Sequence, residues 1–229
     1  IANAQPKFPA VTLIHGNFAE LGNLLNKAGI KKFDGIVADL GFSSPQMADA
    51  GRGFSFQKIG PLDMRYDNSQ SLTAAEIVNH WNEVDIARII KDYSGERFAE
   101  RIARAIVRHR PVTSTIALAQ LIEQAVPVRR KGHHAATRTF QALRIAVNSE
   151  LDSLEALLKE VPLHANPGAR AAFIAFHSLE DIKIRAAMRR WAKQGLGEIL
   201  TKKPIVPTAQ EIHANPRSRS AHLWVFRFN

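Results

Sequence analysis

Residues 39–46 (DLGFSSPQ) combine an acid, two hydroxyls and an amide directly after an apolar run. The side-chain oxygens of such residues accept hydrogen bonds from an amine, and a turn fixed by proline can hold a planar substrate beside them. This segment therefore suggests the positioning of an amino group, with the candidate residues Asp39, Ser43, Ser44, Pro45 and Gln46. The alternative is structural, because Asp and Ser also cap the start of a following helix.

A second polar segment, residues 176–181 (FHSLED), also follows an apolar run. Its His177 and Glu180 could orient a base or take a proton from it. Capping of the next helix explains the same two residues equally well. The His-x-x-Glu spacing and the histidine pair at 133–134 also invite a metal hypothesis. Adjacent histidines point in different directions, however, and no third ligand is in register, so we predict that no metal is required.

Arginines form a line in the segment 97–108. They stand at i, i+4, i+7 and i+11, which places them on one face of a helix: Arg97, Arg101, Arg104 and Arg108. Guanidinium groups in a line could hold the phosphates of a nucleic acid. We expect the same of the basic loop that contains Arg129, Arg130 and Lys131. The alternative is a solvated face with ion pairs inside the helix, such as Glu100 with Arg104.

These residues need strands and helices to position them. Residues 33–39 and 171–176 are compact apolar runs that end in polar residues, as buried parallel strands do. Alternation of strand and helix predicts a parallel sheet that binds ligands at the carboxyl ends of its strands. We also expect a strand at 11–14, a helix at 21–28 closed by Gly29, and a strand at a sheet edge at 223–228.

The middle of the chain has a helical character. Thr73 and Glu76 have capping-box spacing. An apolar stripe at 98, 102 and 106 and the pattern at 114–126 both indicate amphipathic helices.

A long helix is predicted from Thr139 onward, because apolar residues keep a helical period there. We expect Arg144 and Asn148 of this helix to join two parts of the molecule. The predicted organisation is an α/β body interrupted by a mostly helical insert. The body is formed by residues 1–46 and 139–229, and the insert by residues 47–138.

The charge of the chain favours a polyanionic partner. Lys and Arg number 31 against 21 Asp and Glu, which gives a net charge of +10, and each phosphate that a protein neutralises releases counterions. The absence of cysteine excludes a disulfide scaffold, a thiolate zinc site and a cysteine nucleophile. No apolar run approaches the roughly 18 residues of a membrane span. We therefore expect no membrane partner.

Seven segments in order along the chain resemble one family, the 16S rRNA (cytosine(1402)-N4)-methyltransferases. They cover nearly the whole chain, and chance does not produce so many ordered matches. The resemblance implies a Rossmann-like, class I SAM methyltransferase body with a helical substrate-recognition insert, in agreement with the α/β body predicted above. The segments are 39–46 (DLGFSSPQ), 52–56 (RGFSF), 60–65 (GPLDMR), 95–106 (GERFAERIARAI), 137–151 (TRTFQALRIAVNSEL), 176–181 (FHSLED) and 215–220 (NPRSRS).

The resemblance also implies a cofactor, S-adenosylmethionine. By motif position its contacts would be Phe18, Asp39 and Gln46, with the aromatic ring stacked on adenine. Members of the family open with a Gly-rich loop of the type Gly-x-Gly-Gly-His, which lets the backbone approach the cofactor, and an acid that holds the ribose hydroxyls. Residues 1–229 contain neither, so we expect this chain to be a piece of a longer protein. Ile182 stands where the family pattern usually has Arg.

The reaction that the resemblance implies is methylation of N4 of a cytidine near the decoding site of small-subunit ribosomal RNA. The base must leave its stack to reach an active site. We expect Arg52, Phe54 and Phe56 to contact the RNA, with core packing as the alternative for the two rings. The partner is the free RNA or the assembled small subunit, and a homodimer is left open. The expected location is the bacterial cytoplasm, with an organelle that has bacterial-type ribosomes as the alternative. Two other functions are considered: an inactive RNA-binding relative, and a methyltransferase for a protein or a small molecule.

Overall fold

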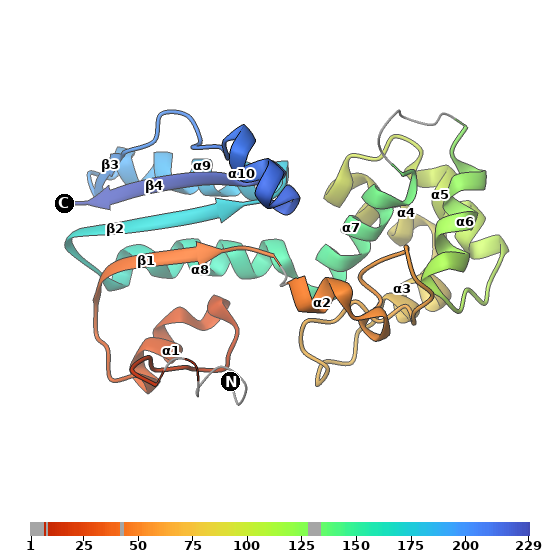
Figure 1. The fold of residues 1–229 in the computed structure, drawn as a ribbon, viewed down its shortest axis with the longest axis horizontal. Helices are drawn as coiled ribbons and strands as arrows, with labels where there is room; N and C mark the ends of the chain where they lie inside the picture. Colours follow the sequence, from red (N-terminus) through yellow and green to blue (C-terminus); the bar gives the residue numbers. More distant parts are fainter. Residues whose placement is uncertain (1–6, 8, 42–43, 128–133) are drawn as a thin grey trace. The chain divides into compact units, whose positions relative to one another are not determined.

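The computed structural model describes residues 7, 9–41, 44–127 and 134–229. It divides into two compact units (Figure 1). The body is formed by Ile1–Gly41 and Leu151–Asn229, and the helical unit by Phe42–Glu150. The sequence predicts the two boundaries after residues 46 and 138, whereas the units change after residues 41 and 150. The difference at the second boundary arises because the helix Ala136–Asn148, most of which the prediction assigned to the body, belongs to the helical unit.

The body contains a four-stranded mixed sheet in the order β1-β2-β4-β3. β1 (Phe33–Asp39) is parallel to β2 (Ala165–Ala175), while β4 (His222–Phe228) is antiparallel to β2 and to β3 (Gly197–Ile199). The strands predicted at 33–39 and 171–176 are present, but the predicted burial of the first is wrong, because β1 has no buried residue and Val37 is 71% exposed. The predicted parallel sheet is also wrong, because β4 makes the sheet mixed. The strand predicted at 223–228 is present, but its predicted edge position is wrong, because it lies between β2 and β3.

Aromatic rings join the sheet to the long helix α9 (Ser178–Lys193). Trp191 of α9 is 1% exposed, and its ring centroid lies 5.3 Å from that of Phe226 and 5.6 Å from that of Phe228. Phe173 of β2 lies 6.2 Å from the same indole. Burial of each such ring contributes on the order of 2 to 3 kcal/mol, so this cluster holds α9 on the sheet. The cluster also explains why every second residue of β4 is aromatic, since Trp224, Phe226 and Phe228 are all buried.

The other body elements are η2 (Phe18–Glu20), α1 (Leu21–Lys27), α8 (Glu150–His164), α10 (Ala209–Ala214) and η4 (Pro216–Ser220). The helix predicted at 21–28 is confirmed, and Gly29 follows it with φ +70°. The strand predicted at 11–14 is wrong, because this segment has irregular backbone. Val11 and Ile14 are 50% and 38% exposed. No strand among the described residues pairs with this short apolar run.

The long helix predicted from Thr139 is in fact two helices. α7 (Ala136–Asn148) ends at Ser149, which has the left-handed φ of +47°, and α8 begins at Glu150. A residue in this conformation ends the helical hydrogen-bond ladder. The apolar spacing nevertheless continues across the break, since Val147 and Leu151 are both buried. Periodicity alone could not detect it.

The helical unit contains α2 (Ser44–Ala48), η3 (Ala50–Arg52), α3 (Ala74–His80), α4 (Glu83–Ser94), α5 (Ala99–Arg108), α6 (Thr115–Ala125) and α7. The hydroxyl of Thr73 accepts the N–H of Glu76 at 3.1 Å, which confirms the predicted cap. The helix predicted at 114–126 is confirmed as α6. The apolar stripe on α5 is confirmed too, since Ile102 and Ile106 are fully buried. No helix in the described part of the chain combines the length and apolar character needed to cross a membrane.

Two glycines let two segments of the helical unit cross in direct contact. A Cβ atom on Gly53, which has φ +70°, would lie 2.1 Å from the carbonyl oxygen of Pro61. A Cβ atom on Gly60 would lie 2.1 Å from the carbonyl oxygen of Ala50. Both obstacles are backbone atoms, which cannot swing aside as a flexible side chain can. The segments 52–56 and 60–65 are therefore held together by their backbones.

Gly60→Ala is expected to lower the free energy of unfolding by about 3 kcal/mol or more, because the added methyl group overpacks a backbone crossing. Gly95→Ala is the control. At Gly95 φ is +60°, but nothing lies within 4 Å of an added Cβ, so only the conformational cost of about 1 kcal/mol is expected. Urea denaturation of the two variants measures both losses. Equal losses would contradict the importance of the crossing.

Candidate functional site at one end of the body sheet

The polar segments that follow the apolar runs meet at one end of the body sheet. β1 and β2 are parallel, with Asp39 paired to Ile174, so both strands end here. β4 is antiparallel and begins at the same end, because His222 pairs with Ala175. The residues after β1, after β2 and before β4 therefore share one edge. Open α/β sheets bind ligands at the carboxyl ends of their parallel strands.

Asp39, the last residue of β1, has an exposed side chain. The next residue, Leu40, is buried and donates its backbone N–H to the carbonyl of Ile174 at 3.1 Å. Gly41 then turns the chain with φ +94°. Within the part of the chain that the structure describes, no side chain or backbone group pairs with the Asp39 carboxylate. Its oxygens are available to a ligand that donates hydrogen bonds.

Phe18, the ring predicted to stack on adenine, begins η2 and is 40% exposed. Asn17 caps this turn by accepting the N–H of Ala19 at 2.9 Å. The amide of Asn17 donates to the hydroxyl of Ser153 in α8 at 3.4 Å. The turn is thereby anchored to the body while the ring stays outside the core.

The remaining residues predicted around the amine are not in the body. Ser44 and Pro45 begin α2 of the helical unit, and Gln46 lies half-buried in the same helix. Ser43 is outside the described residues. The catalytic roles of Ser43, Ser44 and Pro45 and the cofactor role of Gln46 stay predictions.

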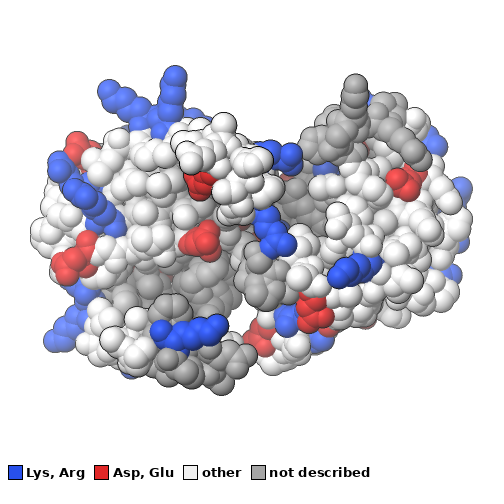
Figure 2. Space-filling model, in the orientation of Figure 1, with Lys and Arg blue, Asp and Glu red and all other residues white. Residues whose placement is uncertain are grey.

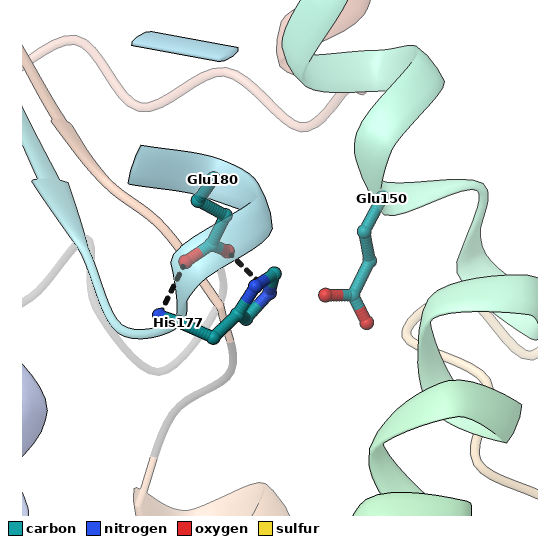
Figure 3. Close-up of side chains that lie close together, drawn as sticks. All are labelled: Glu150, His177 and Glu180. Atoms are coloured by element: carbon teal, nitrogen blue, oxygen red, sulfur yellow. Dashed lines mark hydrogen bonds and ion pairs between the residues drawn. The ribbon is translucent and has the colours of Figure 1, made fainter. Parts of the chain in front are cut away.

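Glu180 fixes the junction between β2 and α9. Its Oε2 accepts the backbone N–H of Phe176 at 2.8 Å and that of His177 at 3.3 Å, and its Oε1 lies 3.2 Å from Nε2 of the His177 ring (Figure 3). Glu180 is 3% exposed, and a carboxylate so far from water needs such donors to stay ionised. These contacts favour the capping interpretation of Glu180. They also hold the ring of His177 in place.

The ring of His177 has unused hydrogen-bonding capacity. Its side chain is 11% exposed. Neither ring nitrogen makes a well-aligned hydrogen bond to any described residue, although Nε2 is within ion-pair distance of Glu180. A buried polar atom without a hydrogen bond requires an explanation, and a catalytic role is one. The role predicted for His177 stays a candidate, as does the prediction that no metal is required.

A third acid, which is not among the residues predicted from the sequence, lies at this edge. Asp181 of α9 bonds Nδ1 of His222 at 3.0 Å through one oxygen and accepts the indole N–H of Trp224 through the other. His222 and Trp224 lie two residues apart on β4 and so share a face. Two features of the sequence could have indicated this contact: an acid beside Glu180, and the alternation of polar and apolar residues in the last strand. Their contact depends on the pairing of β2 with β4, which the sequence did not specify.

The residues predicted to contact the RNA base are packed inside the helical unit. Arg52 donates to the carbonyls of Arg65 at 2.6 Å and Tyr66 at 3.0 Å. Phe54 is 7% exposed and stacks on the Tyr66 ring, with 5.7 Å between centroids. Phe56 lies edge-on to Phe140 at 5.0 Å. These contacts favour the structural alternative for both rings.

Asn148 holds a loop of the helical unit against α7. Its amide donates to the carbonyl of Met64 at 2.7 Å and accepts the N–H of Tyr66 at 2.6 Å. Arg144 pairs with Glu150 at 2.8 Å, and Glu150, also labelled in Figure 3, accepts the Tyr66 hydroxyl at 3.0 Å. We expected Arg144 and Asn148 to join the insert to the body. The contacts described here are internal to the helical unit, because this unit includes Glu150, the first residue of α8.

An ion pair fixes the turn that follows this loop. The guanidinium of Arg65 donates to both oxygens of Asp63, at 2.9 and 2.8 Å, and also to the carbonyls of Asn68 and Gln70. The hydrogen bonds from Arg65 hold the pKa of the Asp63 carboxyl below its ordinary value of 3.8. The motif at 60–65 therefore builds a rigid turn.

All four arginines of the predicted line are exposed, but Arg97 lies before α5, so only Arg101, Arg104 and Arg108 stand on this helix. Arg104 pairs with Glu83 of α4 at 3.3 Å, whereas the alternative named Glu100 of the same helix as its partner. The guanidinium of Arg97 lies 4.6 Å from the ring centroid of Phe98. Among the described residues, Arg101 and Arg108 form no ion pair.

The surface of both units carries more basic than acidic groups. Figure 2 shows Lys and Arg side chains projecting from the visible face of each unit, with fewer Asp and Glu between them. This agrees with the net charge of +10. The predicted basic loop with Arg129, Arg130 and Lys131 is outside the described residues.

Asp63→Asn is expected to lower the free energy of unfolding by about 1 to 3 kcal/mol at neutral pH, because it removes a charged acceptor. The pKa of Asp63 is lowered in the folded protein. The ionised Asp63 carboxylate therefore stabilises the fold fully above its ordinary pKa of 3.8. This stabilisation is lost as the pH falls through the lowered pKa of the folded protein. The difference between the variant and the unaltered chain should stay constant above about pH 5 and shrink below about pH 4.

Urea denaturation between pH 7 and pH 3 measures this difference. Asp92→Asn, which changes an exposed acid on α4, is the control and should show little effect at any pH. A difference for Asp63→Asn that does not change with pH would contradict the ion pair.

Comparison with known proteins connects these elements to one family. Residues 2–229 match the profile of the MraW methylase family. A relative from Cyanothece sp. named Ribosomal RNA small subunit methyltransferase H is 50% identical over 219 residues, which are 96% of this chain and 72% of the relative. Relatives of the same name from Koribacter versatilis and Synechocystis sp. are each 49% identical. They match 94% and 96% of this chain and 69% and 70% of their own lengths.

The ordered motifs of the sequence had indicated this family, and the mixed α/β body agrees with a methyltransferase fold. The resemblance is thus confirmed: this chain belongs to the MraW methylase family.

Proposed function

We propose that this chain methylates small-subunit ribosomal RNA, and that the acceptor is N4 of a cytidine near the decoding site. The observation that carries the proposal is the family match over residues 2–229, supported by relatives named as methyltransferases of small-subunit ribosomal RNA. The choice of atom and nucleotide rests on the ordered motifs of the sequence. Because the relatives are bacterial proteins, the proposal also places the reaction in the cytoplasm, where bacterial ribosomes are.

S-adenosylmethionine is the proposed methyl donor, since it supplies an electrophilic methyl group on a sulfonium. Two residues of the body fit it. The exposed ring of Phe18 can stack on adenine, and the exposed carboxylate of Asp39 can accept hydrogen bonds from the hydroxyls or amino groups of the cofactor. Gln46 of the helical unit is the third residue that the motifs imply.

The exocyclic amine of cytosine is a weak nucleophile, because its lone pair is delocalised into the ring. Groups that accept its N–H protons favour a lone pair on nitrogen, and Ser43, Ser44 and Pro45 are the candidates for this task. The nitrogen also loses a proton when its new bond to carbon forms. We assign the acceptance of that proton to His177, whose buried ring nitrogens make no well-aligned hydrogen bond to described residues. Glu180 is a positioning residue, since backbone amides occupy its carboxylate.

Phosphate contacts, rather than the two phenylalanines, are the proposed source of RNA affinity in the helical unit. Phe54 and Phe56 are engaged with Tyr66 and Phe140, so they are poorly placed to stack on a base. The exposed arginines of α5 can approach phosphates without rearrangement of the core.

Nucleoside mass spectrometry of small-subunit RNA from cells with and without the gene tests the function. We expect N4-methylcytidine to disappear on deletion and to return with the gene. The His177→Gln variant should return it at less than about one hundredth of the initial rate, because it lacks a proton acceptor. Ile182→Ala, which changes a 59% exposed residue of α9, is the control and should act like the unaltered gene.

Unchanged N4-methylcytidine after deletion would reject the function and favour the inactive RNA-binding relative. Full activity of His177→Gln would reject only the role of His177. Parallel assays of the purified gene product on free RNA and on assembled small subunits identify which of them is the substrate.

Arg97→Gln combined with Arg101→Gln is expected to weaken RNA binding and to make it less sensitive to salt. Each phosphate contact with a single strand contributes about 0.7 to the slope of log affinity against log salt, so the slope should fall by about 1.4. Lys202→Gln combined with Lys203→Gln removes two exposed charges from the body and should leave the slope nearly unchanged. An unaltered slope in this variant would remove Arg97 and Arg101 from the RNA-binding surface.

A further inference from the structure

The segment 215–220 (NPRSRS) is a family-like motif that the proposed function does not use. Residues 216–220 of this segment form the short helix η4, immediately before β4. Pro216 stands in the first turn of η4, where its missing N–H costs nothing. The motif therefore has a defined conformation at the entrance to the central part of the sheet.

Ser218 anchors this turn in the body. It is 7% exposed, its hydroxyl donates to the carbonyl of Asn215 at 2.8 Å, and its own carbonyl accepts the N–H of Ala221 at 2.7 Å. Because Ser218 points inward, its two neighbours point outward, and Arg217 and Arg219 are both exposed. Neither arginine forms an ion pair within the ranges that the structure covers. The turn thus presents two guanidinium groups to solvent, while its buried Ser218 holds the backbone in place.

The turn lies at the edge that carries the candidate site. Arg219 precedes His222 by three residues, a backbone distance of no more than about 11 Å. His222 pairs with Ala175, and His177 follows Ala175 by two residues. The two arginines and the His177 ring thus belong to the same end of the body sheet.

The nearby acid does not neutralise these arginines. Both oxygens of Asp181 are engaged, one by His222 and one by Trp224. A further cation, Arg185, lies over the Trp224 ring with 5.5 Å to its centroid. Asp181 is therefore not available to pair with Arg217 or Arg219.

We propose that Arg217 and Arg219 bind backbone phosphates of the RNA within a few nucleotides of the methylated base. A guanidinium group pairs with phosphate through two parallel N–H donors, which a single ammonium group cannot do. Two such groups on a rigid turn would fix the path of the strand as it enters the site. The identity of the ligand as RNA rests on the proposed function.

A chemical double-mutant cycle tests this proposal. The probe is a single-stranded fragment of small-subunit RNA in which one phosphate at a time near the target cytidine is replaced by a neutral methylphosphonate. For the unaltered protein, one or two of these replacements should lower affinity about tenfold, as expected for a lost charge-assisted hydrogen bond. For Arg217→Gln combined with Arg219→Gln, the same replacements should change affinity less than twofold.

Arg189→Gln combined with Arg190→Gln is the matched control. It also removes two exposed arginines. Arg189 lies 11 residues after Ser178, the first residue of α9, which is about 16 Å along the helix. This control should keep the full sensitivity to the neutral phosphates. Replacement of Arg217 and Arg219 by lysine should restore part of that sensitivity, which separates loss of charge from loss of fold, and thermal unfolding verifies that each variant is folded.

Equal sensitivity in the unaltered protein and the Arg217/Arg219 variant would overturn the proposal, as would a protein that does not bind the probe. Loss of sensitivity in the Arg189/Arg190 control as well would overturn the assignment to η4. Methylation of the unmodified fragment is measured in parallel. If the Arg217/Arg219 variant loses its sensitivity to the neutral phosphates but the unmodified fragment is not methylated, the proposed function is rejected and the phosphate contacts are kept. If the fragment is methylated but the variant keeps that sensitivity, only the contacts are rejected.

Discussion

The body depends on the double pairing of β2, which is parallel to β1 on one side and antiparallel to β4 on the other. The parallel ladder makes β1 and β2 end together, and the antiparallel ladder makes β4 begin there. As a result, Asp39, His177 and His222 share one edge although they are far apart in the sequence. The chemistry available at this edge follows from the hydrogen-bond register of the sheet.

Two adjacent acids at the start of α9 serve different partners at that edge. Glu180 binds the backbone amides at the end of β2 and the ring of His177, while Asp181 binds His222 and Trp224 on β4. Successive residues of a helix project about 100° apart, so the two carboxylates reach different neighbours. The histidines differ in burial, with side chains 11% and 41% exposed. The lower exposure of His177 suits the proton transfer that we propose for it.

In the helical unit, residues of the family-like motifs make contacts that hold the fold. The glycines of the motifs at 52–56 and 60–65 permit a backbone crossing, and the Arg65 guanidinium satisfies the Asp63 carboxylate and two carbonyl groups. Arg52 and Arg65 use their guanidinium N–H groups on carbonyls of the same unit, so these donors are not free for phosphates. The RNA contacts we propose therefore fall on exposed guanidinium groups, in α5 and in η4.

The sequence by itself determined the α/β class, the helical middle segment, the strands at 33–39 and 171–176, and the family, because these depend on local periodicity and on the order of motifs. It could not locate the break at Ser149, since apolar spacing continues across it. It also could not decide whether Phe54 faces a ligand or a core, because an aromatic residue suits either. Only the tertiary structure decided that Phe54 packs on Tyr66 and that Asp181 meets His222. Such contacts depend on how distant segments pair and pack, and a pattern of neighbouring residues does not specify that.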